Sequence, residues 1–352
     1  MDRVLPPIVQ ARRVAIPRPR PWPWDWFPAK ATRPAGPLCG QPTFIILSRA
    51  VGARLLLSWL ITMVLVGSAH AMLSVVCTTP DMASIVFALA GDRAGVSVLA
   101  KPTEDPHFVD AKPSFILKLN KADVLFEGGA ELESGWLGPL LESARNPKLA
   151  AGAPGRVSCA VGVELLDVPT TLDRSQGDVH SKGNPHYLMD PKNALKVALT
   201  VAGALSQLDP SNASFYEGNL VQFRKRLELK LVEWEGALAP YKDQPLVAYH
   251  NTWQYFARRF GLKSELFLEP KPGIPPTPTH LARVVAKMKA AQARVIMVEP
   301  YQSRKTAERV AAQVGMVTVV DVSQHPGGVK GTEMDYMSLL DHVVKSLAHA
   351  FR

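Results

Sequence analysis

The stretch Asp105-Pro106-His107-Phe108-Val109-Asp110-Ala111-Lys112-Pro113-Ser114 lies between an apolar run at 96–100 and a segment at 114–121 with helical spacing of its apolar residues. A short apolar run is typical of a buried strand, so His107 follows the carboxyl end of a strand. In open α/β sheets, ligands bind outside the carboxyl ends of the strands. Because a proline restricts the backbone just before His107, the pattern predicts a rigidly held imidazole and a candidate metal ligand.

Strands and helices alternate on both sides of this stretch. The apolar patterns predict strands at 74–79, 96–100, 124–126 and 157–163, and helices at 82–90, 114–120, 132–143 and 192–208. Such an alternation indicates a parallel sheet covered by helices.

A long helix follows and divides the chain. Capping residues at 209–212 precede a helical pattern at 213–238, which only Gly218 and Gly236 interrupt. The predicted helix is roughly 39 Å long, and Pro240 ends it. The α/β alternation then restarts, with predicted strands at 246–249, 294–298 and 317–320 and helices at 252–260, 280–293, 303–314 and 336–349. The sequence therefore predicts an α/β fold of two lobes joined by one long helix: lobes at 72–210 and 240–352, and the linking helix at 211–239.

Three more metal-capable residues lie in comparable places. His186 follows Pro185 and precedes a helix, while His250 and Asp321 each follow an apolar run directly. Three imidazoles and a carboxylate suit Zn²⁺, which takes four N, O or S ligands. The spacings of 79, 64 and 71 residues exclude a zinc finger and suit a site between the lobes.

Each of these residues also has a plain structural interpretation, since loop histidines are common and Asp321 could cap a turn. The position of all four at strand ends favours a shared metal site. His180, His280 and His325 lack this placement or lie near helix starts, so we leave them outside the ligand set.

The charge of the chain is concentrated at its N-terminus. The net charge is +9 over 352 residues, but residues 1–71 hold nine Lys/Arg and two Asp/Glu, against 31 and 29 in the remainder. The folded body is thus nearly neutral, which argues against nucleic acid as a partner.

The N-terminus carries the features of a secretory signal at 54–71. Arg54 precedes an apolar core of 13 residues and a small-x-small site ending at Ala71. The core is short for a membrane span. The cleavage point has no Cys, so a lipid anchor is not indicated. We expect a mature chain from Met72, and either a disordered, proline-rich extension at 1–53 or a translation start near Val51.

Cys77 and Cys159 remain in the mature chain. They are either two buried thiols or, in an oxidising compartment, a disulfide, and they form no CxxC metal motif.

As a set, several motifs resemble the metal-binding receptors of bacterial ABC importers for zinc and manganese, the ZnuA-like group. The likeness covers 74–350 and rests on Asp105-Pro-His107 with Lys112-Pro-Ser, Pro185-His186 with Asp190-Pro-x-Asn193, His250-x-x-x-x-Tyr255-Phe-Ala, and Glu299-Pro with Lys305.

The resemblance implies two four-stranded lobes, bridged by a rigid helix, with the ion held in the cleft between them by His107, His186, His250 and Asp321. It also implies a monomeric periplasmic receptor that is not an enzyme and that delivers its ion to a membrane permease with a cytoplasmic ATPase. Relatives tuned to manganese usually have Glu where this chain has His250, so zinc is expected, with Mn²⁺ or Fe²⁺ as alternatives. The His-rich loop of many zinc receptors is reduced here to His180.

A secreted zinc hydrolase is the rival function from another class. It needs a general base beside the metal, but the chain has no HExxH pattern and Glu299 is the only candidate. A surface adhesin has no support in the sequence.

Overall fold

The computed structural model describes residues 72–170, 180–333 and 335–352. The predicted extension at 1–53 and the predicted signal at 54–71 lie outside these residues. Within the described part, no helix combines the length and the apolar character that crossing a membrane requires.

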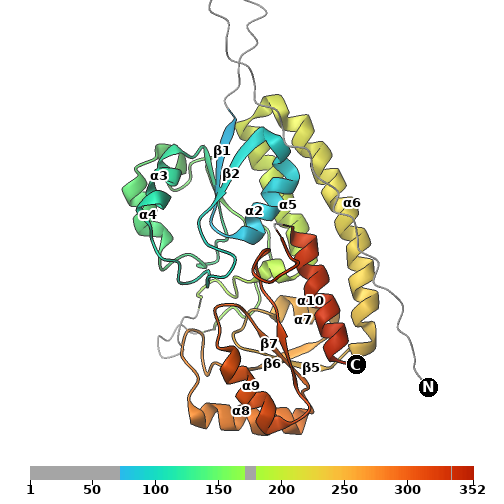
Figure 1. The fold of residues 1–352 in the computed structure, drawn as a ribbon. Coiled ribbons are helices and arrows are strands. Elements are labelled where there is room, and N and C mark those ends of the chain that lie inside the picture. Colours follow the sequence, from blue (N-terminus) through green and yellow to red (C-terminus); the bar gives the residue numbers. More distant parts are fainter. Residues whose placement is uncertain (1–71, 171–179, 334) are drawn as a thin grey trace, which may run out of the picture. The chain divides into compact units, whose positions relative to one another are not determined.

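The N-terminal lobe contains a parallel sheet of four strands in the order β2-β1-β3-β4 (Figure 1). Its strands are β1 (Leu73–Cys77), β2 (Ala94–Val98), β3 (Val124–Glu127) and β4 (Arg156–Ser158). Its helices are α2 (Pro80–Ala90), α3 (Pro113–Lys121), α4 (Leu137–Ala144) and α5 (Pro191–Leu208).

The central strands of this sheet are apolar on both faces, as expected for strands covered by helices on each side. Val75 and Cys77 of β1 pack in one cluster with α2 and α5, whereas Val76 packs in another with α3 and α4.

The C-terminal lobe repeats this topology in a second parallel sheet, ordered β6-β5-β7-β8. Its strands are β5 (Pro245–Ala248), β6 (Lys263–Phe267), β7 (Val295–Val298) and β8 (Thr318–Asp321). Its helices are α7 (Gln254–Phe260), α8 (Pro278–Ala291), α9 (Arg304–Val314) and α10 (Tyr336–Ala350).

The long helix α6 (Ala213–Leu238) lies beside α2, α5 and α10 (Figure 1). Its buried residues recur at helical spacing, as in Phe223, Leu227 and Trp234. The indole Nε1 of Trp234 donates a hydrogen bond to Oδ1 of Asp341 on α10 (2.8 Å). The helix is therefore fastened to elements from both ends of the described chain.

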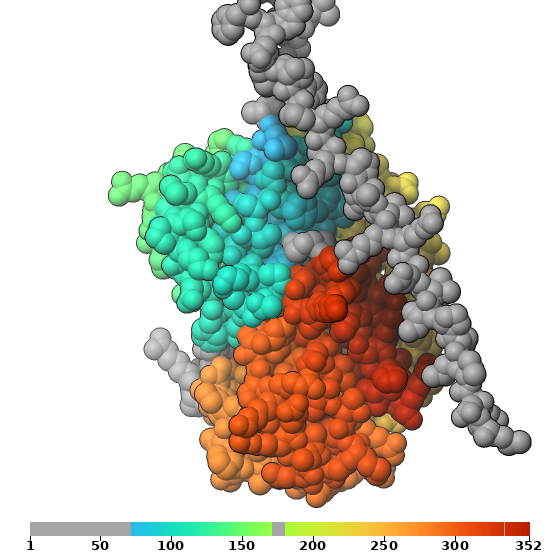
Figure 2. All heavy atoms as spheres, in the orientation of Figure 1, coloured from blue at the N-terminus to red at the C-terminus, as the bar shows by residue number. Residues whose placement is uncertain are grey.

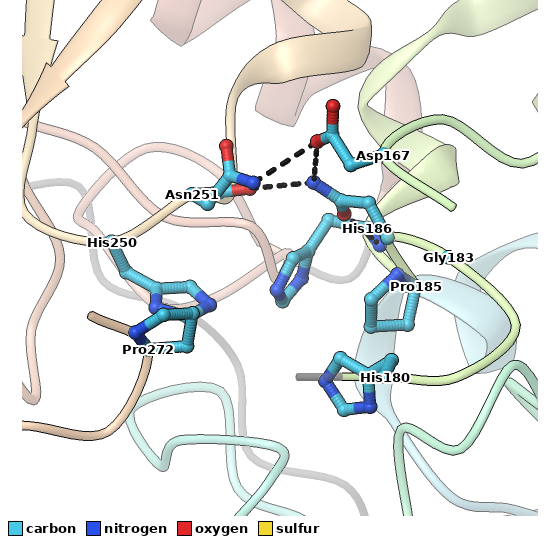
Figure 3. Close-up of a pocket in the computed structure, with 9 residues that line it drawn as sticks. Asp167, His180, Gly183, Pro185, His186, His250, Asn251 and Pro272 are labelled. Carbon is cyan, nitrogen blue, oxygen red and sulfur yellow. Dashed lines mark hydrogen bonds between the residues drawn. The ribbon is translucent and has the colours of Figure 1, made fainter. Parts of the chain in front are cut away.

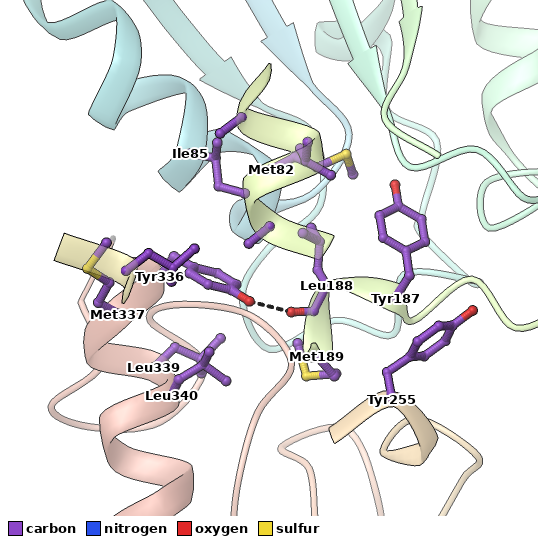
Figure 4. Packing of buried hydrophobic residues seen from close by; sticks show 14 of the residues in the cluster. Met82, Ile85, Tyr187, Leu188, Met189, Tyr255, Tyr336, Met337, Leu339 and Leu340 are labelled. Atoms are coloured by element: carbon purple, nitrogen blue, oxygen red, sulfur yellow. Dashed lines mark hydrogen bonds between the residues drawn. The ribbon is translucent and has the colours of Figure 1, made fainter. Parts of the chain in front are cut away.

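The two lobes share one hydrophobic cluster, which includes Val75 of β1, Leu246 of β5 and Leu340 of α10. At the junction, the Tyr336 hydroxyl donates a hydrogen bond to the carbonyl oxygen of Leu188 (2.6 Å; Figure 4). Figure 2 shows atoms of the N-terminal lobe in direct contact with the last part of the chain. The turn after His186 is thus part of the packed interior.

The predicted fold class is confirmed: two parallel four-stranded sheets flanked by helices. The details differ in places. Strand β6 was not predicted, and the helix expected at 132–143 begins only at Leu137, after left-handed backbone at Gly129, Ala130 and Glu131. The lobe boundaries remain predictions, and α10, assigned to the C-terminal lobe, also packs against α2 and α6. Cys77 and Cys159 are buried free thiols.

Candidate metal centre

His107 lies in the loop between β2 and α3, where Asp105 fixes its orientation. Oδ1 of Asp105 accepts hydrogen bonds from the backbone N–H of His107 (3.0 Å) and from its ring Nδ1 (2.8 Å). Burial opposes ionisation of Asp105, but the hydrogen bonds and the charge of His107 outweigh it and hold the pKa of this carboxyl below its usual range. A carboxylate only accepts hydrogen bonds, so the proton of the imidazole is on Nδ1 and Nε2 carries the free lone pair.

His186 is buried at the start of the turn Tyr187–Met189. Its Nδ1 donates to Oε1 of Gln324 (2.9 Å), a side chain of the C-terminal lobe. Gln324 is itself held, because its Nε2 donates to the Tyr301 hydroxyl (2.9 Å) and its backbone N–H donates to Oε1 of Glu299 (3.1 Å). This contact across the lobes again leaves Nε2 of the histidine unprotonated.

His250 comes two residues after the end of β5, and its Nδ1 donates to Oε2 of Glu269 (3.0 Å). The same oxygen accepts the backbone N–H of Gly273 (3.3 Å), which fixes the carboxylate in the proline-rich loop. All three imidazoles therefore have an engaged Nδ1, the arrangement that orients metal-binding histidines in proteins.

The three rings converge on one point from both lobes. Their centroids are 5.0 Å apart for His107 and His186, and 5.3 Å apart for each of these with His250. One ligand atom from each residue lies within 4.8 Å of the other two. The Nε2 atoms of His107 and His186 are buried and have no hydrogen-bond partner. A cation at this point would satisfy these nitrogens, which are otherwise costly to bury.

A cavity of about 140 Å³ adjoins this point and is lined by His180, His186, His250 and Pro272 (Figure 3). Part of its wall is a hydrogen-bonded group of polar residues. Nδ2 of Asn184 donates to Oδ2 of Asp167 (3.2 Å) and to the carbonyl oxygen of Asn251 (2.8 Å), and Nδ2 of Asn251 donates to the same Oδ2 (3.0 Å). These bonds join the two lobes beside the histidines.

The histidines differ in their affinity for protons. Burial, followed by the charges of His107 and His250, lowers the pKa of His186 well below its ordinary value. Burial also lowers the pKa of His180 to about 4. Burial opposes protonation of His250 too, but the hydrogen bond and charge of Glu269 outweigh it, so the pKa of His250 is raised. Of His180, His186 and His250, His250 therefore binds a competing proton most readily.

Asp321, the fourth predicted ligand, is outside this group. It is the last residue of β8, as predicted, but its side chain is 63% exposed and forms an ion pair with Arg304 at the start of α9. The structure thus brings together three of the four predicted residues, whereas the carboxylate of Asp321 is paired with the guanidinium of Arg304 and is not in this group.

The sequence reasoning missed several residues of the site. The anchors Asp105 and Glu269 are each joined to a histidine, and the Asp-x-His spacing is a signal that could have identified the first. No sequence signal indicated Gln324. His180, left aside above, stacks on His107 with a centroid separation of 5.1 Å.

Glu299, the base that a hydrolase would need, is buried within a hydrogen-bonded network. Its Oε2 accepts hydrogen bonds from the hydroxyls of Thr252 (3.1 Å) and Tyr301 (2.7 Å), and its Oε1 accepts the backbone N–H of Gln324. These hydrogen bonds give Glu299 a structural role, because they hold Gln324 in place.

Known proteins resemble this chain along most of its length. The family model described as zinc-uptake complex component A periplasmic matches residues 75–350. The iron-binding protein YfeA of Yersinia pestis is 29% identical over 287 residues, covering 79% of this chain and 86% of that protein. The manganese ABC transporter substrate-binding lipoprotein PsaA of Streptococcus pneumoniae serotype 4 is 23% identical over 282 residues, covering 78% of this chain and 88% of that protein.

A solved structure of a ZnuA deletion mutant with zinc bound has a TM-score of 0.67 at 26% identity, covering 80% of this chain and 98% of that one. The family match spans almost the whole of the described chain, and these proteins are receptors, not enzymes. The chain therefore belongs to the ZnuA family of metal-binding receptors of ABC transporters.

Proposed function

We propose that this protein binds one divalent transition-metal ion, zinc in preference to others, with His107, His186 and His250 as ligands. The observation that carries the proposal is the convergence of one nitrogen from each histidine within 4.8 Å of the others. The two buried Nε2 atoms without partners support it, because a bound cation would pair with both.

The preference for zinc rests on the chemistry of these donors. Imidazole nitrogen suits zinc, whereas Mn²⁺ prefers carboxylate, carbonyl and water oxygens. The carboxylates closest to the histidines, Asp105 and Glu269, are bound to Nδ1 atoms and orient the rings. Fe²⁺ and Mn²⁺, which the names of two relatives carry, are the alternatives.

The receptor would act in the periplasm, as a monomer, and pass its ion to the membrane permease of an ABC importer with a cytoplasmic ATPase. The family description and the relatives support this role. Two ligands come from the N-terminal lobe and one from the C-terminal lobe, so a small displacement of either lobe or its loops would open the site for transfer.

Competition titration of the purified protein against chelators of known affinity tests the proposal. We expect one zinc ion per chain, bound more tightly than manganese or iron. His107→Ala and His250→Ala should each lose stoichiometric zinc, because each removes one of three ligands. His349→Ala is the matched control, since this histidine is exposed on the last turn of α10.

The outcomes separate the possibilities. Wild-type protein without stoichiometric zinc, or ligand variants that bind zinc as tightly as the wild type, would contradict the proposed site. Tighter binding of manganese than of zinc would assign the same site to manganese.

A further inference from the structure

The three histidines leave the coordination of a zinc ion incomplete. Zinc in proteins is held by four ligands, in structural sites usually all from the protein, and catalytic sites keep one position for water. A receptor has no catalytic use for that water. Asp321 is exposed and paired with Arg304, so the fourth position is open to a water or to another donor beside the histidines.

His180 has the features of that donor. Its Nε2 is buried and has no hydrogen-bond partner, the same condition as Nε2 of His107 and His186. Its ring stacks on that of His107, with centroids 5.1 Å apart and an interplanar angle of 26°. It also lines the cavity next to His186 and His250 (Figure 3).

A pair of hydrogen bonds fixes the backbone beside His180. The carboxylate of Glu131 accepts the backbone N–H of Ser181 and its hydroxyl, both at 2.5 Å. Glu131 adopts a left-handed backbone conformation (φ +68°), as does Ala130 (φ +50°). Residues other than glycine rarely adopt this conformation, and it persists where the surrounding structure requires it. The fold thus maintains a costly turn that holds Ser181, and with it His180, at the cavity.

We propose that His180 supplies the fourth nitrogen to the ion held by His107, His186 and His250. The inference rests on the proposed function and extends it. In the structure, His180 is not among the nitrogens within 4.8 Å of one another, and it stacks on His107 instead. Since Glu131 holds the neighbouring backbone, His180 reaches the ion by rotation about its own side-chain bonds.

A set of four imidazoles has a consequence for selectivity. It provides no oxygen ligand and therefore favours zinc over manganese more strongly than three imidazoles with a carboxylate would. His180 also borders the cavity, so its rotation away from the ion would open one coordination position without moving the other three ligands.

X-ray absorption spectroscopy of the zinc-loaded protein, with competition titration, tests this proposal. We expect four imidazoles around zinc in the wild type, and three with one oxygen in His180→Ala and His180→Gln. Zinc affinity should fall at least about tenfold in both, as for the loss of a group that supports a metal site. His349→Ala should match the wild type in both measurements.

The results distinguish this inference from the proposed function. Stoichiometric zinc in the wild type with three imidazoles, and unchanged affinity in both His180 variants, would overturn the role of His180 alone. A wild type that binds no zinc would overturn both proposals. If the metal-free variants unfold at the same temperature as the metal-free wild type, any loss of zinc affinity arises at the metal site and not from loss of the fold.

Discussion

Each histidine of the centre is held through its Nδ1 by a different acceptor: Asp105, Gln324 and Glu269. Every contact fixes both the orientation of the ring and the position of its proton, so the three Nε2 atoms are prepared for a cation before it arrives. Such supporting residues commonly contribute 10- to 100-fold to metal affinity.

Of these three acceptors, Gln324 is the best one to test, because its hydrogen bond to His186 joins the two lobes. In Gln324→Ala, the buried Nδ1 of His186 loses its acceptor and the ring loses its orientation. We expect zinc affinity to fall about 10- to 100-fold. Competition titration measures this, with Gln222→Ala on the exposed face of α6 as the control. Equal affinity of Gln324→Ala and wild type would show that the contact has no role in binding.

The pH dependence of binding should follow His250. A proton on this ring competes with the ion, so affinity falls as the pH drops through the raised pKa of His250. His180 and His186, whose pKa values are lowered, stay neutral at that pH and add nothing to the slope.

Glu269→Gln tests this assignment. Glutamine can still accept the Nδ1 hydrogen bond, but it lacks the charge by which Glu269 raises the pKa of His250, so this pKa should fall. The midpoint of zinc affinity against pH, measured between about pH 5 and 8, should move to lower pH. A midpoint identical to that of the wild type would place the competing proton on another group.

The sequence predicted residues better when their backbone position decided their role. His107, His186 and His250 follow strands or prolines, and this placement was enough to predict that they share a site. Asp321 has the same placement, but the side chain of Arg304 binds it, and such a pairing is invisible in a linear pattern. Gln324 was missed because its role depends entirely on a contact across the lobes.

Among the elements, α6 was predicted with its observed bounds because a helical pattern with only two glycines runs from Ala213 to Leu238 and a proline follows. Strand β6 was missed because it lies at the edge of its sheet, where alternate residues are exposed and the apolar signal is weak. Helix α4 begins later than predicted because the chain turns at Ala130 and Glu131. The residues of that stretch favour a helix, so the sequence did not indicate the turn.

Replacing an exposed glycine of helix α6 by alanine should make the protein more stable. A Cβ at Gly218 would meet no atom within 4 Å, and the residue is exposed in the helix interior. Gly218→Ala should therefore raise the free energy of unfolding by roughly 0.5–1 kcal/mol, because alanine loses less backbone entropy. Urea unfolding of the metal-free protein measures the change.

Gly155→Ala provides the contrasting control. A Cβ there would lie 2.5 Å from the carbonyl oxygens of Asp123 and Lys148, so this variant should be less stable than the wild type. Destabilisation by Gly218→Ala, or a neutral Gly155→Ala, would contradict the packing described for these two positions.

At the scale of the whole molecule, the lobes form one folding unit. They share a hydrophobic cluster, and polar contacts reinforce the junction. The guanidinium of Arg259 on α7 donates two hydrogen bonds of 2.7 Å to the carboxylate of Asp190 at the start of α5. The hydroxyl of Tyr255 donates to the carbonyl oxygen of Asn184 (2.7 Å).

Thermal unfolding should therefore show one cooperative transition that zinc shifts to higher temperature. An ion that binds only the folded state stabilises it by about 2.7 kcal/mol when free zinc is 100-fold above the dissociation constant. Differential scanning calorimetry with and without zinc measures this, and His107→Ala should show little shift. Two separate transitions would mean that the lobes unfold independently.

We expect His107, His186 and His250 to bind a single cation between the lobes. Anomalous diffraction from crystals of the zinc-loaded protein, recorded on both sides of the zinc absorption edge, would locate this cation. We expect one strong peak per chain, at about 2.0–2.1 Å from Nε2 of all three histidines. A peak elsewhere, or none near these three nitrogens in zinc-loaded protein, would contradict it.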